Sequence, residues 1–328
     1  MIEVLIKSFV MIAVLLTLAA YMTLAERVVM AWMQQRLGPN RVGPFGLLQP
    51  LADGIKLLFK ERFQPDGVEK FAYWLAPAIS LFCALFIFVL IPVGGTVRLF
   101  GQEVTLQIAD INSGVVFLLA ISSLAVYGVV LAGWSSNSRY SLLGGLRGTA
   151  QMISYEIPMG IAILTVVITA GTLSLAEIVN QQRDHWFIWT HPVSFLIYLT
   201  TAFAETNRAP FDMPEAEQEL TGGYHTEYGG LKFALFFIAE YINILAVSAL
   251  ATTLFLGGWL GPFEWGKEIP VLWFALKMAF FVFLFIWVRA TLPRLRYNQL
   301  MSFGWKVLIP LATINLIVSA YFTLRYSS

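Results

Sequence analysis

Residues 79–91 read Ile79-Ser80-Leu81-Phe82-Cys83-Ala84-Leu85-Phe86-Ile87-Phe88-Val89-Leu90-Ile91, and this run decides the fold class of the chain. It carries no charge, and it is flanked by further apolar residues that extend it to about twenty, enough to cross a bilayer as a helix. A transmembrane β-strand alternates lipid-facing apolar and inward polar residues, so an uninterrupted apolar run excludes a β-barrel. The run therefore predicts a membrane-spanning helix.

The composition extends this prediction to the whole chain. Of its 328 residues, 58% are hydrophobic and only 12% are charged, and the mean hydropathy is +0.72. A soluble globular domain carries about a quarter charged residues. We therefore expect an all-α polytopic membrane protein that forms a single integral membrane domain over residues 1–328.

The apolar runs predict eight spanning helices. Their expected ranges are 4–25, 72–92, 113–133, 150–170, 191–205, 232–256, 271–290 and 304–324. The fifth is short and contains Thr200, Thr201 and Glu205, which predicts a helix that ends inside protein rather than at the lipid surface. Residues 10–21 also fit the core of a signal peptide, but Glu3 and the lack of a small-x-small cleavage site favour an uncleaved first membrane helix.

The basic residues predict the orientation of these helices. The loops expected at about 26–71, 134–149, 206–231 and 291–303 hold Arg36, Arg41, Lys56, Lys60, Arg62, Lys70, Arg139, Arg147, Arg208, Arg294 and Arg296. The opposite side holds only Lys7, Arg98, Arg183, Lys267 and Arg325. This asymmetry puts the four loops together on the cytoplasmic side and both termini outside.

The first of these loops contains an amphipathic segment after the turn-rich run Gly38–Gly46. Apolar residues recur there at helical spacing, namely Leu47, Leu48, Leu51, Ile55 and Leu58, and the opposite stripe holds Gln49, Asp53, Lys56 and Lys60. The pattern is typical of a helix that lies along the membrane surface. Two interpretations remain open: the helix is an interfacial anchor, or its polar face roofs a cavity.

Residues 204–230 are unusually acidic for so hydrophobic a chain. This segment, the acidic loop, holds Glu205, Asp212, Glu215, Glu217, Glu219 and Glu227. Asp212-Met213-Pro214-Glu215 is typical of a helix start, with a capping Asp and a Pro in the first turn, and Gly222-Gly223 would end that helix. So much carboxylate between two apolar runs indicates that charge or protons are handled here.

Ionisable residues also interrupt the predicted spans, where they are costly and therefore candidates for function. They are Glu26 and Arg27 at the end of the first span, Glu156 in the fourth, Glu240 with Asn243 one turn further in the sixth, and Lys277 in the seventh. One interpretation is that they form ion pairs between helices, for example Glu240 with Lys277. The other is proton storage and relay, because the acids outnumber the cations at that depth. Glu26 beside Arg27 is by itself interpreted as a snorkelling interfacial pair.

The sequence offers few ligands for a redox centre or metal. Cys83 is its only cysteine, and His185, His191 and His225 are scattered. We therefore expect no internal disulfide, no cysteine-ligated iron–sulfur cluster and no metal site in this chain. The net charge of +1 gives no reason to expect binding to nucleic acid.

Several runs in one order resemble a known family. They are Ala25-Glu26-Arg27, Gln35–Gly43, Leu48–Lys56, Gly133–Tyr140, Ser154-Tyr155-Glu156, the whole of Ala204–Gly230, Ala239-Glu240-Tyr241 and Arg294–Met301. Together these runs resemble the family of the quinone-site membrane subunit of respiratory complex I, the proton-translocating NADH–quinone oxidoreductase. Because they extend over nearly the whole chain, the resemblance is specific.

The resemblance implies a role for particular residues. The quinone portal and chamber would be lined by Glu26, Arg27, Arg36, Asp53, Lys56, Phe211 and Asp212. A proton relay toward the membrane arm would use Glu156, Glu205, Glu215, Glu217, Glu227 and Glu240. Some relatives have a further acid in the third span, where this chain offers only hydroxyl and aliphatic side chains between Ser122 and Gly133.

The resemblance also implies partners and a location. Quinone would be the substrate, this chain would bind no cofactor, and FMN and iron–sulfur clusters would reside in partner subunits. The expected partners are the terminal iron–sulfur subunit, the peripheral quinone-site subunit, small membrane-arm subunits and lipids. The expected location is an energy-conserving membrane, the bacterial inner membrane, with both termini periplasmic. Two alternatives stay open: the corresponding subunit of an energy-converting hydrogenase, and a stand-alone cation/proton antiporter, which the absence of a visible internal repeat disfavours.

Overall fold

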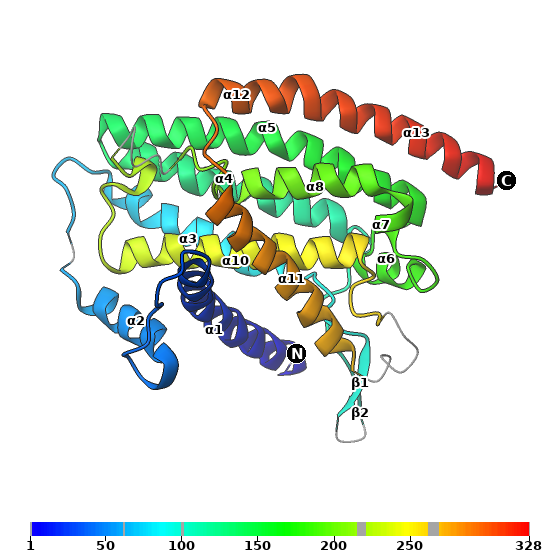
Figure 1. The fold of residues 1–328 in the computed structure, drawn as a ribbon, viewed down its shortest axis with the longest axis horizontal. Helices are drawn as coiled ribbons and strands as arrows, with labels where there is room; N and C mark the ends of the chain where they lie inside the picture. The colour runs from blue at the N-terminus through cyan, green and yellow to red at the C-terminus, as the bar shows by residue number, and fades with distance from the viewer. Residues whose placement is uncertain (1, 62, 100–101, 215–220, 262–268, 328) are drawn as a thin grey trace.

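A computed structural model describes residues 2–61, 63–99, 102–214, 221–261 and 269–327, and over these residues the chain is mainly helical with a single short strand pair (Figure 1). The longer helices are α1 (Ile2–Met33), α2 (Gln49–Phe59), α3 (Lys70–Ile87), α4 (Gly114–Ser135), α5 (Arg139–Ala170), α8 (Pro192–Glu205), α10 (Leu231–Phe255), α11 (Pro270–Thr291) and α13 (Ile309–Ser327). The shorter elements are η1 (Pro44–Gly46), β1 (Thr96–Leu99), β2 (Gln102–Thr105), α6 (Leu175–Gln181), α7 (Phe187–Thr190), η2 (Gly223–His225), α12 (Tyr297–Phe303) and the π-helical turn η4 (Gly304–Leu308). The all-α prediction is confirmed.

The spanning helices match the eight predicted runs. Within the described residues, seven helices are long and apolar enough to cross a membrane, the last of them continuous from Tyr297 to Arg325. The fifth predicted span is α8, which has only 14 residues. At 1.5 Å per residue it is about 21 Å long, short of a hydrocarbon layer of about 30 Å. Its carboxyl end is buried, as predicted, since Ala204 and Thr206 are almost fully covered.

Three predicted loop boundaries are wrong. The loop expected from about residue 26 begins only after Met33, where α1 ends. The loop expected at 134–149 is only the link Ser136–Ser138, because α5 begins at Arg139. The glycine-rich start of α5 obscured this helix, and packing explains it: a Cβ on Gly145 would meet the Cα of Gly133 at 3.1 Å, so small residues let α5 and α4 approach closely. Likewise the loop expected at 291–303 ends at α12, which begins at Tyr297.

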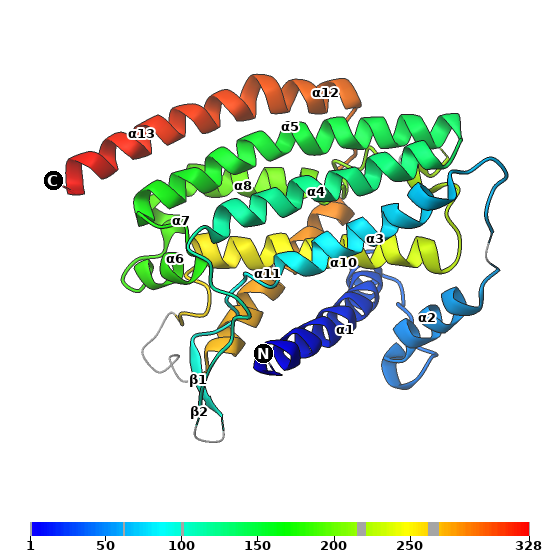
Figure 2. The same cartoon turned by 180° about the vertical axis from the view of Figure 1, so that it is seen from behind.

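The opposite end of the bundle holds elements that the sequence pattern did not predict. An antiparallel hairpin pairs β1 with β2 in the register Thr96↔Thr105, and α6 and α7 lie nearby between α5 and α8 (Figures 1 and 2). These elements have only four to seven residues each, too few to give a clear period in the sequence.

Helix α10 lies at the centre of the bundle and α1 and α13 lie at its outer sides (Figures 1 and 2). Two thirds of the apolar window of α10 is buried, against about a tenth for α1. Apolar residues on α1 and α13, such as Phe9 and Ile317, are exposed, as expected of helices at the outer sides of a membrane bundle. The central helix is therefore where ionisable side chains are best shielded from water.

The four predicted cytoplasmic-side segments share one end of the bundle, as expected. The Tyr73 hydroxyl donates to the Glu227 carbonyl at 2.6 Å, and the Ser141 hydroxyl donates to the Tyr224 carbonyl at 2.8 Å. The Leu295 amide donates to the Pro210 carbonyl at 3.1 Å. The predicted amphipathic helix is α2, which stands away from the bundle at this end with Leu51, Ile55 and Leu58 exposed (Figure 1).

Candidate functional site

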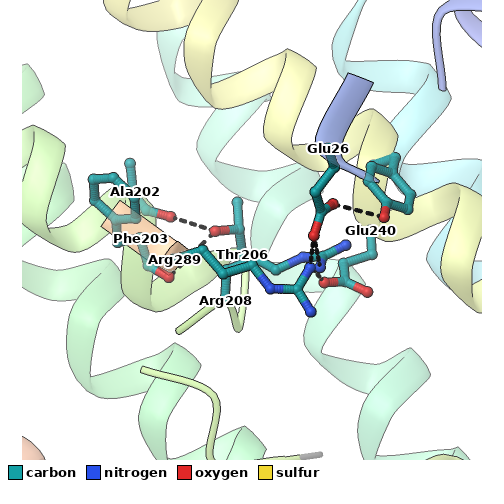
Figure 3. Close-up of polar contacts among 8 residues, drawn as sticks. Glu26, Ala202, Phe203, Thr206, Arg208, Glu240 and Arg289 are labelled. Atoms are coloured by element: carbon teal, nitrogen blue, oxygen red, sulfur yellow. Dashed lines mark hydrogen bonds and ion pairs between the residues drawn. The ribbon is translucent and has the colours of Figure 1, made fainter. Parts of the chain in front are cut away.

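Four charged side chains meet inside the bundle at the end that carries the acidic loop (Figure 3). The Glu26 carboxylate of α1 pairs with Arg289 of α11, and lies 3.5 Å from Nη1 of Arg208 in the acidic loop. Arg208 also pairs with Glu240 of α10. We call these four residues the buried charge network. Its charges alternate in sign, and its Glu26, Arg208 and Glu240 side chains are only 7%, 6% and 11% exposed.

Aromatic residues complete the network. The Tyr241 hydroxyl donates to Glu26 Oε2 at 2.7 Å. The same ring lies under the Arg208 guanidinium, whose carbon is 4.7 Å from the ring centroid. A cation over a ring face is favourable, especially when desolvated. Buried charges need such paired and hydrogen-bonded surroundings, so the network explains how this segment tolerates charge in an apolar bundle.

The network corrects three expectations from the sequence. Glu26 does not snorkel beside Arg27 at an interface but is buried among partners from other helices. Glu240 is not an acid without a cation, because Arg208 is present at its depth. The suggested Glu240–Lys277 pair is absent from the described ion pairs; the Lys277 ammonium instead donates to the Leu256, Gly258 and Leu260 carbonyls, where it caps the end of α10.

Local bonds fix the turn that carries Arg208. The Thr206 hydroxyl bonds back to the Ala202 carbonyl at 3.0 Å and to the Phe203 carbonyl at 3.2 Å, which ends α8 (Figure 3). Asn207 then adopts a φ of 52°, in the left-handed region that Asn tolerates better than most residues. This reversal directs Arg208 back toward α1 and α10.

Gln151 of α5 holds the same turn from the other side, although the sequence pattern did not single it out. Its side-chain amide donates to the Ala204 carbonyl at 2.7 Å and to the Phe211 carbonyl at 2.6 Å, bridging the two ends of the turn. Gln151 is fully buried. A polar residue five positions before Glu156 in an apolar span was the available signal, since a buried amide requires partners.

Glu205 lies between two small cavities. One, of about 40 Å³, is also lined by Asn243 and Glu240; the other, of about 20 Å³, is also lined by Asn243 and Ser122. One water needs roughly 10–15 Å³ of such space. Glu205 Oε2 is buried and has no hydrogen-bond partner among the described residues, so water in these cavities is the available partner.

Glu156 lies beyond the second cavity. Its Oε1 accepts a hydrogen bond from Ser123 of α4, and the Ser122 hydroxyl is 3.5 Å from the same oxygen. No ion pair involving Glu156 or Glu205 is formed within the described parts of the chain. The acids Glu240, Glu205 and Glu156 therefore follow one another through two cavities and a pair of hydroxyls.

The carboxyl half of the acidic loop is anchored by aromatic residues. Tyr228 stacks on Tyr73, with ring centroids 4.2 Å apart, and its hydroxyl lies 3.2 Å from that of Ser135. Burial raises the pKa of Tyr228 well above its usual range. Glu227 contributes its backbone carbonyl to this anchor, and among the described residues no hydrogen bond or ion pair joins its carboxylate to Glu156, Glu205 or Glu240.

The predicted quinone-side residues fall into two groups. Arg27 donates to Asp53 of α2 at 2.7 Å, and Gln49 donates to the same carboxylate at 2.9 Å. This contact ties α2 to the end of α1. Arg36 and Lys56 are exposed, and Arg36 donates to the nearby Gln34 side chain.

Phe211 and Asp212 lie on the acidic loop beside the network. Phe211 is buried against Tyr155, with centroids 5.6 Å apart, and lines an apolar cavity of about 670 Å³ between α8, α11 and α12. Asp212 Oδ1 is buried. The relay candidates Glu215 and Glu217 lie outside the described residues, as does the part of the expected short helix over 215–220. Asp212, Met213 and Pro214, where that helix is expected to begin, are described and are not helical.

Comparisons with known proteins agree with this architecture. A model of the NADH dehydrogenase family matches residues 6–320. The chain is 75% identical over 308 residues to the H subunit of the NADH-quinone oxidoreductase of Protochlamydia amoebophila, covering 94% of each chain. It is 56% identical over 308 residues to the first H subunit of the Geobacter metallireducens enzyme, covering 94% of this chain and 92% of that one. The H subunit of the Leptospira biflexa enzyme is 52% identical over 337 residues, covering 98% and 95%. The chain therefore belongs to the NADH dehydrogenase family and is a multi-pass membrane subunit of an NADH-quinone oxidoreductase complex.

Proposed function

We propose that this chain forms the quinone portal and part of the quinone chamber, and relays the redox state of the quinone through buried carboxylates to the proton-pumping membrane arm. The observation that carries the proposal is the buried charge network, because it joins the acidic loop to three spanning helices. Intramembrane charges of this kind mark ion and proton pathways. The chain works in this way as one integral membrane domain, residues 1–328.

The portal would lie beneath α2. This helix presents apolar side chains outward and is tied to α1 through the Arg27–Asp53 contact. An apolar-tailed quinone with a polar head needs a gate that is amphipathic and partly charged. Glu26, Arg36, Lys56, Phe211 and Asp212 would line the path between this gate and the acidic loop.

The relay would start when the quinone is reduced next to the acidic loop. Reduced quinone takes up protons or exposes negative charge, and in a low-dielectric site such charge acts strongly on nearby carboxylates. The Arg208–Glu240 pair can respond by exchanging partners, which makes the loop the bistable element. Glu205 and Glu156 would pass the change laterally, with Glu215, Glu217 and Glu227 on the loop as further proton carriers.

The surroundings of the chain follow from this role. Electrons would reach quinone from a partner subunit with the terminal iron–sulfur cluster, next to a peripheral quinone-site subunit, and FMN would reside in another partner. Small membrane-arm subunits would receive the relay on the Glu156 side, where Ser123 of α4 is exposed. We place the complex in the bacterial inner membrane with both termini periplasmic, in line with the asymmetry of basic residues.

The variant Glu205→Gln in the assembled complex tests the proposal. We expect quinone-coupled proton pumping to fall by roughly a hundredfold, the lower range for loss of a positioned proton-transfer group. Electron transfer from NADH to an artificial acceptor should stay intact, because that acceptor takes electrons upstream of quinone. Pumping is measured by acidification inside inverted membrane vesicles.

Glu177→Gln is the matched control. Glu177 is likewise a glutamate of this chain that accepts a hydrogen bond from a hydroxyl, that of Thr172, as Glu156 does from Ser123, but it is exposed and lies on α6 at the opposite end of the bundle. This variant should pump normally. Unchanged pumping per electron together with unchanged quinone turnover in Glu205→Gln would refute the relay.

A further inference from the structure

We propose that Ser122 and Ser123 of α4 form a hydroxyl bridge that passes protons between the cavity beside Glu205 and the carboxylate of Glu156. This inference rests on the proposed relay, and it names the groups that close the gap between its two acids. Neither serine was a candidate from the sequence, where the third span offers no carboxylate.

The position of the serines is the first argument. Ser122 lines the cavity of about 20 Å³ that Glu205 also lines, and its Oγ is 3.5 Å from Glu156 Oε1. Ser123, on the next position, bonds the same oxygen. The pair therefore touches the cavity on one side and the second acid on the other.

The sharing of acceptors is the second argument. Both hydroxyls also reach the Leu119 carbonyl, Ser122 at 2.9 Å and Ser123 at 3.0 Å. Each hydroxyl has one hydrogen and two acceptors, Leu119 O and Glu156 Oε1, so rotation about the Cβ–Oγ bond switches it between them. The ionised Glu156 draws both hydrogens toward Oε1, and the protonated Glu156 releases them to Leu119 O.

The transfer step balances without any further reactant. A hydronium in the cavity gives a proton to Ser122 Oγ while the original Ser122 hydrogen passes to Glu156 Oε1. The hydronium becomes water, one O–H bond of Ser122 breaks as another forms, and the carboxylate becomes a carboxylic acid. Ser123 holds Oε1 in place during the step and stabilises the ionised state before it.

Three variants test the bridge in the assembled complex: Ser122→Ala, Ser123→Ala and the double variant. The double variant removes both hydroxyls that reach Glu156 Oε1. We therefore expect it to pump about tenfold more slowly, with transfer from NADH to an artificial acceptor unchanged. In redox-difference infrared spectra the carboxylic C=O band that Glu156→Gln removes should shift to higher frequency in the serine variants, because the acid loses hydrogen bonds.

The controls distinguish proton transfer through the two serines from a purely structural role of these serines, and from a failure of the proposed relay as a whole. Thr165→Val removes a fully buried hydroxyl that donates within its own helix, to Ile161 O, and should change neither readout. Ser122→Thr keeps a hydroxyl at this position and should therefore pump like the wild type. Normal pumping and an unshifted band in the double variant overturn the bridge, and they leave the relay standing if Glu205→Gln still fails to pump. Loss of pumping in Thr165→Val as well would also overturn it.

Discussion

Glu26 and Arg289 form an ion pair although they are 263 positions apart in the chain. The pair joins α1 to α11, two helices that otherwise present much of their surface outward. Because Arg208 also approaches Glu26, the acidic loop is fastened between the first and seventh spans. Removing the negative charge of Glu26 would leave the guanidinium groups of Arg208 and Arg289 without this counter-charge.

We expect Glu26→Gln to destabilise the protein by about 3–5 kcal/mol, the usual result when one partner of a buried pair is removed. The measurement is the heat-inactivation temperature of the assembled complex. Glu3→Gln is the control, since Glu3 pairs with Lys7 on the same helix but its side chain is 67% exposed. Such surface pairs contribute little. Equal inactivation temperatures for Glu26→Gln and the wild type would contradict the structural role of the network.

Gln151→Leu should lower quinone turnover by more than its loss of stability explains. The change leaves the Ala204 and Phe211 carbonyls without their donor and frees the turn that carries Glu205 and Arg208. Each lost bond costs about 1–3 kcal/mol of stability, and the displaced turn lowers quinone turnover. Turnover and inactivation temperature are measured on the same membranes.

Gln182→Leu is the matched control for this variant. Gln182 is equally buried and donates to the Ile178 and Thr253 carbonyls, but at the opposite end of the bundle. It should lose comparable stability and keep its turnover per assembled complex. If the two variants lose turnover equally, Gln151 has no special relation to the acidic loop.

Asp53→Asn should weaken the use of quinone with little effect on stability. Arg27 and Asp53 are 46% and 32% exposed, so their contact adds little to folding, yet it ties α2 to α1. We expect a several-fold higher KM for a short-chain quinone and unchanged transfer from NADH to an artificial acceptor. Glu61→Gln removes an exposed acid just beyond α2 and should leave KM as it is. A normal KM in Asp53→Asn would remove the support for a gate at this helix.

Tyr228 gives a prediction about alkaline pH. Burial raises the pKa of its hydroxyl in the folded protein, whereas the unfolded chain keeps the usual value of about 10. Below that pH the phenol is protonated in both states. Above it the unfolded state releases a proton that the folded state retains, so stability falls as pH rises.

Tyr228→Phe should remove this loss. The difference in Tm between variant and wild type should grow in favour of the variant above pH about 10, and stay constant below it. Tyr140→Phe, at an exposed tyrosine, is the control and should give parallel curves. Parallel curves for Tyr228→Phe as well would show that the buried hydroxyl does not resist ionisation.

The eight spans and α2 could be predicted because lipid imposes a pattern on local sequence: long apolar runs for spans, and one apolar stripe for the surface helix. The start of α5 shows no such pattern, because its first turns are not an apolar run. Its first turns contain Arg139, Gly144, Gly145 and Arg147, which are typical of a loop until the close approach to α4 is known.

The candidate acids were also visible in the sequence, but their partners were not. The sequence places Arg208 among the loop cations, because nothing local indicates that the turn after α8 directs it into the bundle. Depth alone makes Lys277 one possible partner of Glu240, whereas backbone carbonyls at the end of α10 accept its hydrogen bonds. Ion pairs and hydroxyl contacts between distant segments depend on the fold, and no period in one segment encodes them.

The hydrogen bond from the Leu295 amide to the Pro210 carbonyl has a practical consequence. It couples the 292–296 link mechanically to the acidic loop, so a displacement of one should be visible in the other. The only native thiol, Cys83, is buried, and a fluorophore placed on an introduced cysteine in that link would face little competing labelling. A fluorophore on the 292–296 link would therefore report movement of the Pro210 turn without any change to the loop's own side chains.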